Sequence, residues 1–164
     1  MNCLTNKIAF VSGATSGLGK ELSIHLSKNG YHVLIHGRNQ NKLNYLFDQI
    51  KSLSGTSTII NLDLNDYNGI DKLGYEIFKK YKTLDLLVMN AAILGTLTPL
   101  CHQEPKEFEK VLNTNLVANF RLLRSLELSL KKSKDGQLCV ISSKLTKNPK
   151  PFWGAYSVSK AALE

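Results

Sequence analysis

The fold of this 164-residue chain is decided by residues 7–19, which read KIAFVSGATSGLG. The first six of these residues form a short apolar run rich in β-formers, and a helical apolar pattern follows the last glycine. The stretch therefore predicts a strand, a glycine-rich turn and a helix. Glycines let such a turn approach a pyrophosphate group closely, and the free N–H groups at the start of the helix favour its charge.

The three glycines have different expected roles. Gly13 would make the tight turn, Gly17 would permit the close approach of a pyrophosphate, and Gly19 would allow the helix to pack. An ordinary glycine-rich connection between a strand and a helix is the alternative interpretation. The spacing of the glycines here is G-x-x-x-G-x-G, which differs from the G-x-G-x-x-G fingerprint. This difference leaves fewer classes of protein as candidates.

Strand and helix patterns alternate along the rest of the chain, and one apolar helical face predicts a long helix over residues 108–126. Further strands are predicted at residues 31–36, 56–62, 84–89 and 137–142. This alternation predicts an α/β fold, a Rossmann-like doubly wound parallel sheet in three layers, α/β/α, in a single domain of residues 1–164. Ligands bind beyond the carboxyl ends of such strands. The residues expected to ring that crevice are Gly13 to Gly19, Gly37, Arg38, Asp63, Asn90, Ser142 and Ser143.

Composition excludes several classes of function. The net charge of +8 comes from scattered lysines without an aromatic-basic stripe, so nucleic-acid binding is not expected. No apolar run reaches the length of a membrane span, and residues 1–7 lack the core of a signal peptide. We therefore expect a cytoplasmic protein with no membrane partner.

Three cysteines, Cys3, Cys101 and Cys139, are odd in number and match no metal-ligand spacing. Cys139 also lies inside an apolar run. We expect reduced, structural thiols and no metal site.

Near the end of the chain, Tyr156 and Lys160 are four residues apart in the segment YSVSK. On a helix this spacing places both side chains on one face, where an ammonium can lower the pKa of a phenol. That arrangement would make an acid/base catalyst. The spacing alone is also typical of a solvated helix face, so its interpretation depends on the other motifs.

Taken together, these motifs resemble the classical short-chain dehydrogenase/reductase family, from Lys7 to the final residue. The matching elements occur in the family's order, with Ser12 to Gly19 for T-G-x-x-x-G-x-G, Asp63-Leu64 for the Asp after the third strand, Asn90-Ala91-Ala92 for N-N-A-G, Asn115-Leu116 for the Asn of the long helix, Ser143, and Tyr156 to Lys160. Ser12, Met89 and Ala92 depart from the usual Thr, Asn and Gly.

The resemblance implies a role for each member of the tetrad. Tyr156 would be the general acid, Lys160 would lower its pKa and hold the nicotinamide ribose, and Ser143 would bond the substrate oxygen. Asn115 would hold a water that links the lysine to solvent. The implied cofactor contacts are Gly13, Thr15, Ser16, Gly17, Leu18, Gly19, Arg38, Asp63, Leu64, Asn90, Ala91, Tyr156 and Lys160.

Structural alternatives exist for two of these residues. Either Ser142 or Ser143 could instead cap a turn after the strand, although the thirteen-residue spacing to Tyr156 favours Ser143. Asn115 and Asn119 fall on the same apolar helix face and could form a buried structural network. Asn113 is only two residues away, but the phase of the helix favours Asn115.

Cofactor choice is predicted from the end of the second strand, which reads HGRN over residues 36–39. A carboxylate there would bond the ribose hydroxyls of NAD, whereas Arg38 offers a planar fork suited to a 2′-phosphate. We therefore expect a preference for NADP(H), with NAD(H) possible. Some NADP-binding members of the family also carry a basic residue in the glycine-rich turn where this chain has Ser16, so the expected preference is modest.

The expected substrate is a small-molecule carbonyl or alcohol of unspecified identity. Lys144, Lys147 and Lys150 lie between Ser143 and Tyr156, where they could attract an anionic substrate or belong to a solvated loop. Phe152 and Trp153 fit either a substrate pocket or a loop anchor.

The chain stops shortly after Lys160, whereas a complete family member continues through two further strands, the carboxamide-binding loop and the substrate lid. The last strand would then be an unprotected sheet edge and the last helix marginal. We expect poor stability and little reductase activity of the chain as given, and a homo-oligomer for the full-length family form. Two functions follow, an NADP(H)-dependent oxidoreductase and a truncated, noncatalytic dinucleotide-binding module.

Overall fold

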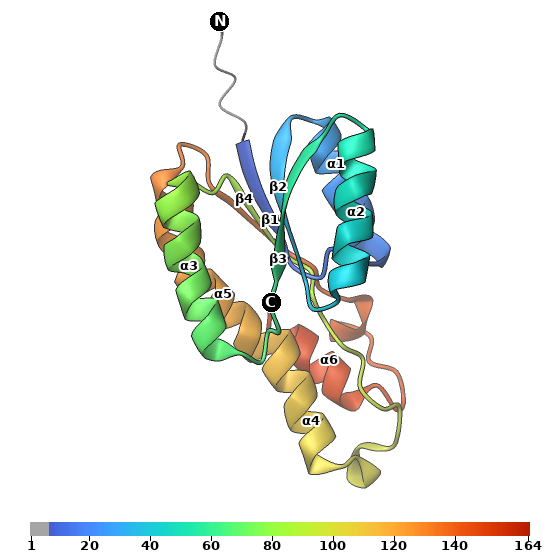
Figure 1. Cartoon of the computed structure of the whole chain (residues 1–164). Helices are drawn as coiled ribbons and strands as arrows, with labels where there is room; N and C mark the ends of the chain where they lie inside the picture. The colour runs from blue at the N-terminus through green and yellow to red at the C-terminus, as the bar shows by residue number, and fades with distance from the viewer. Residues whose placement is uncertain (1–6) are drawn as a thin grey trace, which may run out of the picture.

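The computed structural model of the protein describes residues 7–164 (Figure 1). Strands and helices alternate as the sequence predicts. In chain order the elements are β1 (Lys7–Val11), α1 (Gly17–Lys28), β2 (Tyr31–Gly37), α2 (Gln40–Ser52), β3 (Thr56–Asn61), α3 (Tyr67–Tyr81), β4 (Leu86–Met89), η1 (Leu100–His102), α4 (Pro105–Leu112), η2 (Asn113–Val117), α5 (Ala118–Lys132), β5 (Gln137–Val140), η3 (Lys144–Thr146) and α6 (Gly154–Ala161).

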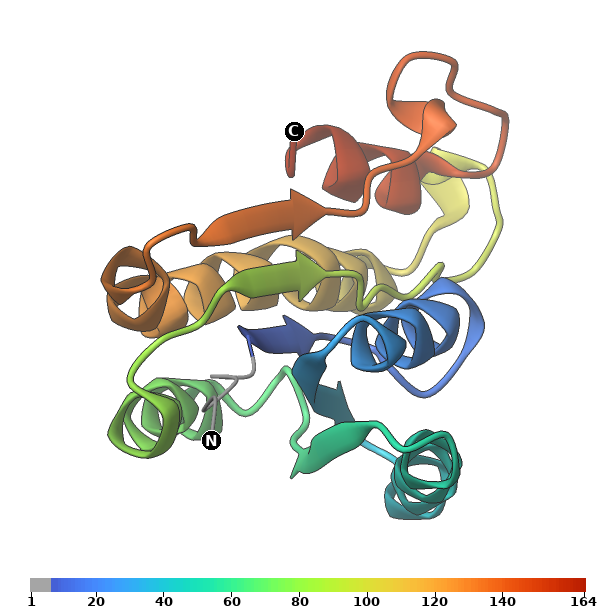
Figure 2. The same ribbon diagram turned by 90° about the horizontal axis from the view of Figure 1, so that it is seen from above.

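The five strands form one parallel sheet in the order β3-β2-β1-β4-β5 (Figure 2). Helices α1 and α2 cover one face of the sheet, and α3 and α5 cover the other (Figure 1). Strands β2 and β3 extend the sheet on one side of β1, and β4 and β5 extend it on the other, so the strand order reverses between β1 and β4. The predicted Rossmann-like, doubly wound fold is confirmed, and a crevice is expected at this reversal.

The core consists of two apolar clusters, one on each face of the sheet. Phe10 and Leu34 pack with α3 and α5, whereas Val11 and Ile35 pack with α1 and α2. Because side chains alternate along a strand, β1 and β2 supply both clusters, and both strands are almost fully buried. This explains why their sequences read as continuous apolar runs.

The predicted long helix is interrupted by a π-helical turn. Helices α4 and α5 follow one helical path, but η2 lies between them, with the Ala118 N–H bonded to the Asn113 carbonyl oxygen five residues back. The extra residue in this turn changes which side chains face inward, so that Thr114 and Asn115 are both buried. Such single π turns recur at functional sites.

Strand β5 is two residues shorter than predicted and lies at the edge of the sheet. Leu138 and Cys139 are exposed there. The expectation of structural thiols is therefore wrong for Cys101 and Cys139, which are free and exposed, because the apolar pattern around Cys139 belongs to an edge strand. The expectations for Cys3 and for residues 1–6 fall outside the described residues.

Within residues 7–164, no helix is both long and apolar enough to cross a membrane. In the same part of the chain, no three His, Cys, Asp or Glu side chains gather in a way that could hold a metal ion.

Candidate active site

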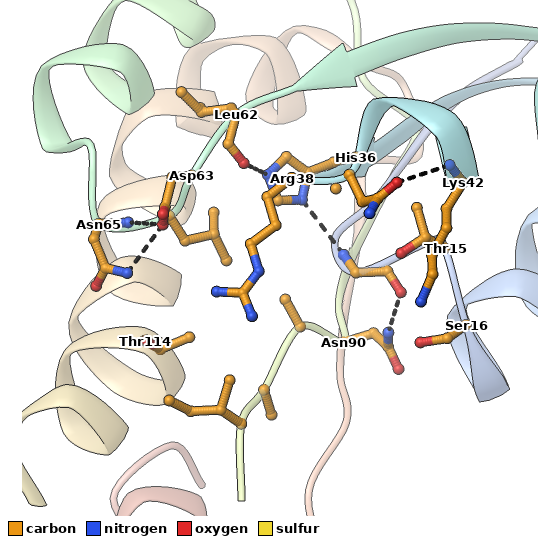
Figure 3. A pocket seen from close by; sticks show the side chains of 17 residues that line it. Thr15, Ser16, His36, Arg38, Lys42, Leu62, Asp63, Asn65, Asn90 and Thr114 are labelled. Atoms are coloured by element: carbon orange, nitrogen blue, oxygen red, sulfur yellow. Dashed lines mark hydrogen bonds between the residues drawn. The ribbon is translucent and has the colours of Figure 1, made fainter. Parts of the chain in front are cut away.

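A cavity of about 550 Å³ opens at the carboxyl ends of β1, β2, β3 and β4 (Figure 3). We refer to it as the main cavity. Its lining consists of Gly13, Thr15, Ser16, His36, Gly37, Arg38, Asn39, Lys42, Leu62, Asp63, Leu64, Asn65, Asn90, Ala91, Ala92, Ile93 and Thr114. The cavity therefore brings together eight of the residues that the sequence assigned to cofactor contact, from four separate connections.

The glycine-rich turn is held tightly against the start of the β4 connection. Gly13 has a φ of +65°, and a Cβ added to it would lie 2.9 Å from the Cα of Ala91. A Cβ at Gly19 would overlap the Gly13 carbonyl oxygen and lie 2.5 Å from Asn90 Nδ2. Gly19 thus packs against the turn itself, which leaves no space for a larger residue.

Ser12 and Asn90 fasten this turn by reciprocal hydrogen bonds. The Ser12 hydroxyl accepts from the backbone N–H of Asn90 at 2.9 Å and of Ala91 at 3.0 Å. The Asn90 side chain donates to the carbonyl oxygens of Ser12 at 3.0 Å and Gly13 at 3.2 Å. A serine at the family's threonine position therefore keeps the hydroxyl that the turn needs. Sequence reasoning treated Ser12 only as a departure, and its hydroxyl was the available signal.

The first turn of α1 fits an anion. Its N-cap, Ser16, makes no side-chain hydrogen bond to the helix, and no acidic residue lies in the first turn. The amide groups there remain available beside Thr15 and Ser16, which line the main cavity. Gly17, with a φ of +51°, has open space where a Cβ would point. Gly17, Leu18 and Gly19 do not line the cavity, and they form the first turn of α1 directly after Ser16, which does.

Two cations and one carboxylate line the side of the main cavity formed by β2 and β3. Arg38 points into the cavity and forms no ion pair within the described residues (Figure 3). Asp63 is oriented by Asn65, whose backbone and side-chain N–H groups both donate to Asp63 Oδ1 at 2.9 Å.

Lys42 is the second cation, and sequence reasoning missed it. The side chain of Asn39 accepts a hydrogen bond from the Lys42 backbone N–H at 3.0 Å and so caps α2. This cap places Lys42 in the first turn of α2, four residues after Arg38, and its side chain enters the cavity. The capping residue just after Arg38 was the signal that could have located it.

The predicted acid/base pair lies on α6. Lys160 is 2% exposed, and its Nζ lies 5.9 Å from the centre of the Tyr156 ring. The same Nζ donates to the Ile141 carbonyl oxygen at 2.6 Å, and burial lowers the pKa of this ammonium. Tyr156 is half-buried and packs edge-to-face with Trp153 at 6.0 Å. The helix therefore brings a buried cation beneath a phenol, as the spacing predicts.

Ser143 and Ser142 have different hydrogen bonds. Ser143 is the N-cap of η3, and its Oγ accepts from the Leu145 N–H at 3.3 Å, so Ser143 rather than Ser142 caps the turn after β5. This bond leaves the Ser143 hydroxyl hydrogen free to donate to another group. Ser142 donates instead to Glu164 Oε1 at 2.5 Å. We refer to Ser143, Tyr156 and Lys160 as the α6 cluster.

Asn115 is completely buried, and its amide is almost fully occupied by protein groups. Its Oδ1 accepts from the Ile93 N–H at 2.8 Å, and its Nδ2 donates to the Ile93 carbonyl oxygen at 2.9 Å and to Ser159 Oγ at 3.0 Å. The Asn115 carbonyl oxygen accepts from Asn119 Nδ2 at 2.6 Å. The side chain thus links the β4 connection to α6, and the network considered as an alternative is present. Asn113 is exposed.

The α6 cluster and Asn115 do not line the main cavity. Ile93 and Thr114, which do line it, are the points of connection: Ile93 is bonded to Asn115, and Thr114 is its neighbour in η2. The candidate site therefore has two parts joined through the π-helical turn.

A parallel doubly wound sheet with a glycine-rich turn at its crossover is the architecture of dinucleotide-binding proteins. The family model described as short chain dehydrogenase matches residues 7–164. The chain therefore belongs to the short-chain dehydrogenase/reductase family of oxidoreductases, as the sequence motifs predict.

Relatives of known sequence and structure agree with this assignment. The chain is 32% identical over 164 residues to the uncharacterized oxidoreductase YciK of Escherichia coli (strain K12), covering 98% of the chain and 65% of YciK. It is 32% identical over 160 residues to the 3-oxoacyl-[acyl-carrier-protein] reductase FabG of Rickettsia felis, covering 98% of the chain and 63% of that protein. The chain thus spans somewhat less than two thirds of these relatives.

Two solved structures of short chain dehydrogenases with bound cofactor have the same fold. One from Shigella flexneri, complexed with NADP, has a TM-score of 0.91 at 31% identity, covering 96% of this chain and 67% of that one. One from Escherichia coli CFT073, complexed with NADPH, has a TM-score of 0.90 at 31% identity with the same coverage, 96% and 67%.

Proposed function

We propose that the chain carries the cofactor site and the acid/base pair of an NADP(H)-dependent oxidoreductase that interconverts a small-molecule carbonyl and alcohol. One observation carries this proposal: the Lys160 ammonium is buried beneath the Tyr156 ring at the same end of the sheet as the main cavity. A buried cation in this position stabilises the deprotonated form of a nearby phenol. An unassisted tyrosine is a poor acid/base catalyst at neutral pH.

The residues of the α6 cluster divide the proton chemistry between them. When bound, a nicotinamide cofactor supplies the hydride that reaches the carbonyl carbon. Tyr156 donates its phenolic proton to the carbonyl oxygen, Ser143 donates a hydrogen bond to the same oxygen, and Lys160 stabilises the phenolate that remains. In the direction of alcohol oxidation the phenolate accepts the proton back. Asn115 keeps α6 in place through Ser159, next to Lys160.

The main cavity fits the adenosine and pyrophosphate portion of a dinucleotide. The uncapped amides at the start of α1 suit the pyrophosphate, and the open space at Gly17 leaves room for it. Arg38 and Lys42 present two positive charges at the end of β2, where no carboxylate stands to bond a free 2′-hydroxyl. This supports NADP(H) as the preferred cofactor over NAD(H). The NADP and NADPH complexes of two structural relatives support the same choice.

Titration of the purified chain with NADPH and with NADH tests the cofactor proposal directly. NADPH should bind with micromolar affinity and NADH about tenfold more weakly, a difference in binding free energy of about 1.4 kcal/mol. A panel of aldehydes and ketones, monitored by consumption of NADPH, then tests turnover. Equal binding of the two cofactors contradicts the role of Arg38, and binding of neither contradicts the proposed function.

A noncatalytic dinucleotide-binding module is the second candidate, and the separation of the two parts of the site favours it. The residues of the α6 cluster lie outside the main cavity, and Lys160 is engaged by the Ile141 carbonyl oxygen. NADPH binding without turnover of any carbonyl would support this candidate. Turnover that depends on Tyr156 would exclude it.

We also propose that the full-length form is a homo-oligomer. Phe120 and Leu128 are each 60% exposed on α5, two turns apart, and an exposed apolar face of this kind fits a partner subunit. Analytical ultracentrifugation tests this proposal, and a monomer at micromolar concentration contradicts it.

A further inference from the structure

His36 is a buried histidine that lines the main cavity near the end of β2. It is 2% exposed, and its ring stacks on Phe10 with 5.7 Å between ring centres and 26° between ring planes. In Figure 3 the ring lies between Leu62 and the glycine-rich turn. A purely apolar residue could fill this space, so the polar atoms of the ring need an explanation.

Both ring nitrogens are hydrogen-bonded to backbone groups from different connections. The Gly13 N–H donates to Nδ1 at 3.4 Å, and Nε2 lies 3.0 Å from the Leu62 carbonyl oxygen. An N–H can only donate and a carbonyl oxygen can only accept. The ring must therefore be neutral, with its hydrogen on Nε2. Burial supports this state, since desolvation lowers the pKa of His36 to about 4 even though the hydrogen bond to Leu62 and the Asp63 carboxylate both oppose that shift.

These two bonds join opposite walls of the main cavity. Gly13 begins the glycine-rich turn, and Leu62 directly precedes Asp63. Residue 36 also binds the turn through its backbone, because the Ala14 N–H donates to the His36 carbonyl oxygen at 2.8 Å. Asp63 comes from the β3 connection, Arg38 from the β2 connection and Lys42 from the first turn of α2. The two ring bonds therefore link the segments that carry these charged groups to the glycine-rich turn.

We infer that His36 is a positioning residue that holds the glycine-rich turn and the end of β3 in the arrangement that receives the adenosine half of a dinucleotide. This inference rests on the proposed function, because it assumes that a dinucleotide binds in the main cavity. A preformed cavity does not have to be ordered when the ligand binds, and affinity is higher for that reason.

Two variants at position 36 test the inference. His36→Leu keeps apolar volume and removes both bonds, and His36→Asn keeps an acceptor at the Nδ1 position. His32→Leu is the matched control, because His32 lies on the same strand, four residues away at the end remote from the glycine-rich turn. Its ring nitrogens contact Thr56 and Thr58 instead of the cavity.

The probes are NADPH, 2′,5′-ADP for the adenosine half, and reduced nicotinamide mononucleotide for the other half. His36→Leu should weaken binding of NADPH and of 2′,5′-ADP about tenfold each and leave the mononucleotide unchanged. His36→Asn should restore affinity to within about threefold of the wild type. His32→Leu should bind all three probes as the wild type does.

The possible failures can be told apart. If the wild-type chain binds NADPH but His36→Leu binds it equally well, with only a lower melting temperature, His36 has a structural role alone and the inference is overturned. If the wild-type chain binds neither NADPH nor 2′,5′-ADP, the proposed function fails, and the inference fails with it.

A measurement on the wild-type chain covers the case in which a variant does not fold. Nitrogen-15 NMR of the histidine rings at pH 7 should show His36 neutral, with its hydrogen on Nε2, and a hydrogen-bond coupling from the Gly13 amide to Nδ1. A charged ring, or the hydrogen on Nδ1, overturns the inference.

Discussion

The main cavity and the α6 cluster lie at the same end of one sheet, yet they are supported in different ways. The cavity is built on β1 and β2, which are buried on both faces, and its connections are tied by Ser12, His36 and Asn90. The α6 cluster follows β5, an exposed edge strand. Its Ser143 is the N-cap of η3, and its Tyr156 and Lys160 belong to an eight-residue helix that packs on α4, η2 and η3. The proposed cofactor site is therefore built on buried strands, whereas the proposed acid/base pair lies on a short helix next to an exposed edge strand.

This difference explains how the two proposed functions can coexist in one sequence. The motifs for both functions are present, but each motif can act only if the surrounding elements hold its residues in position. Local unfolding of α6 would expose only one buried apolar residue of that helix, Ala155, whereas β1 and β2 could separate only if the two core clusters came apart. We therefore expect changes in the two regions to separate turnover from binding.

The largest expected effect is on catalysis, from Tyr156→Phe. Removal of the phenolic hydroxyl should lower kcat for carbonyl reduction by about a hundredfold or more, since general acid/base groups contribute about 10² to 10⁴. NADPH affinity and the melting temperature should stay close to wild type, because the hydroxyl makes no hydrogen bond within residues 7–164. Steady-state kinetics of the two proteins measures the effect.

Tyr75→Phe is the matched control for this variant, because Tyr75 is 66% exposed on α3, away from both parts of the site. Its kcat should equal that of the wild type. Unchanged turnover in Tyr156→Phe would sink the catalytic assignment and leave the noncatalytic module as the function of the chain.

The next effect compares the frames of the two regions. Phe10→Ala should cost about 3–5 kcal/mol of unfolding free energy, because it empties a fully buried site between β1 and the α3 and α5 layer. Leu138→Ala on β5 should change it by less than about 1 kcal/mol, since Leu138 is 45% exposed. Urea denaturation measures both. Similar losses in the two variants would show that β5 is as well buried in solution as β1.

Much of this arrangement can be predicted from the sequence. The sequence predicts strands β1 to β4 because buried parallel strands have short apolar sequences. It also predicts the cavity residues Gly13, Arg38, Asp63 and Asn90, because they follow those strands. The family motifs add residue types that the spacing alone could not single out. The local pattern is sufficient here because each signal lies within one strand and its connection.

Other features depend on contacts between distant parts of the chain. The π-helical turn at η2 changes the hydrogen-bond register without changing residue spacing, so the sequence predicted one uninterrupted helix. The bridge from His36 to Gly13 and Leu62 spans 23 and 26 residues, and no local pattern reports it. The expectation of a structural thiol at Cys139 is wrong because an apolar edge strand and a buried strand have similar sequences, so the sequence does not reveal that Cys139 is exposed.

The third prediction concerns pH and the frame of the main cavity. Burial lowers the pKa of His36 from 6.5 to about 4. Between these two pH values the unfolded chain binds a proton at this residue and the folded chain does not. The associated stability is present above pH 6.5 and is lost as the pH falls to about 4. The free energy of unfolding lost over this pH range is about 3 kcal/mol.

Comparison with His36→Leu isolates this contribution. Between pH 7.5 and 4.5 the wild type should lose more unfolding free energy than the variant, by up to about 3 kcal/mol, in urea denaturation. His32, whose pKa is also lowered, mainly by desolvation, titrates in both proteins and cancels from the difference. Parallel pH profiles for the two proteins would mean that His36 is solvated or charged in the folded state.

The smallest expected effect concerns the cations of the main cavity. Arg38 and Lys42 are exposed, so water and salt weaken their attraction for a 2′-phosphate, and each should contribute less than a buried contact would. Arg38→Ala should weaken NADPH binding about tenfold and Lys42→Ala about threefold, with NADH affinity unchanged in both. Lys51→Ala is the control, because Lys51 lies near the other end of α2, outside the main cavity, and should leave both affinities unchanged.

If Arg38→Ala weakens binding of NADPH and of NADH equally, the arginine supports the fold of the cavity and does not select the cofactor. If the preference for NADPH also survives in about 0.5 M salt, roughly three times physiological ionic strength, the discrimination comes from bidentate hydrogen bonds more than from screened charge.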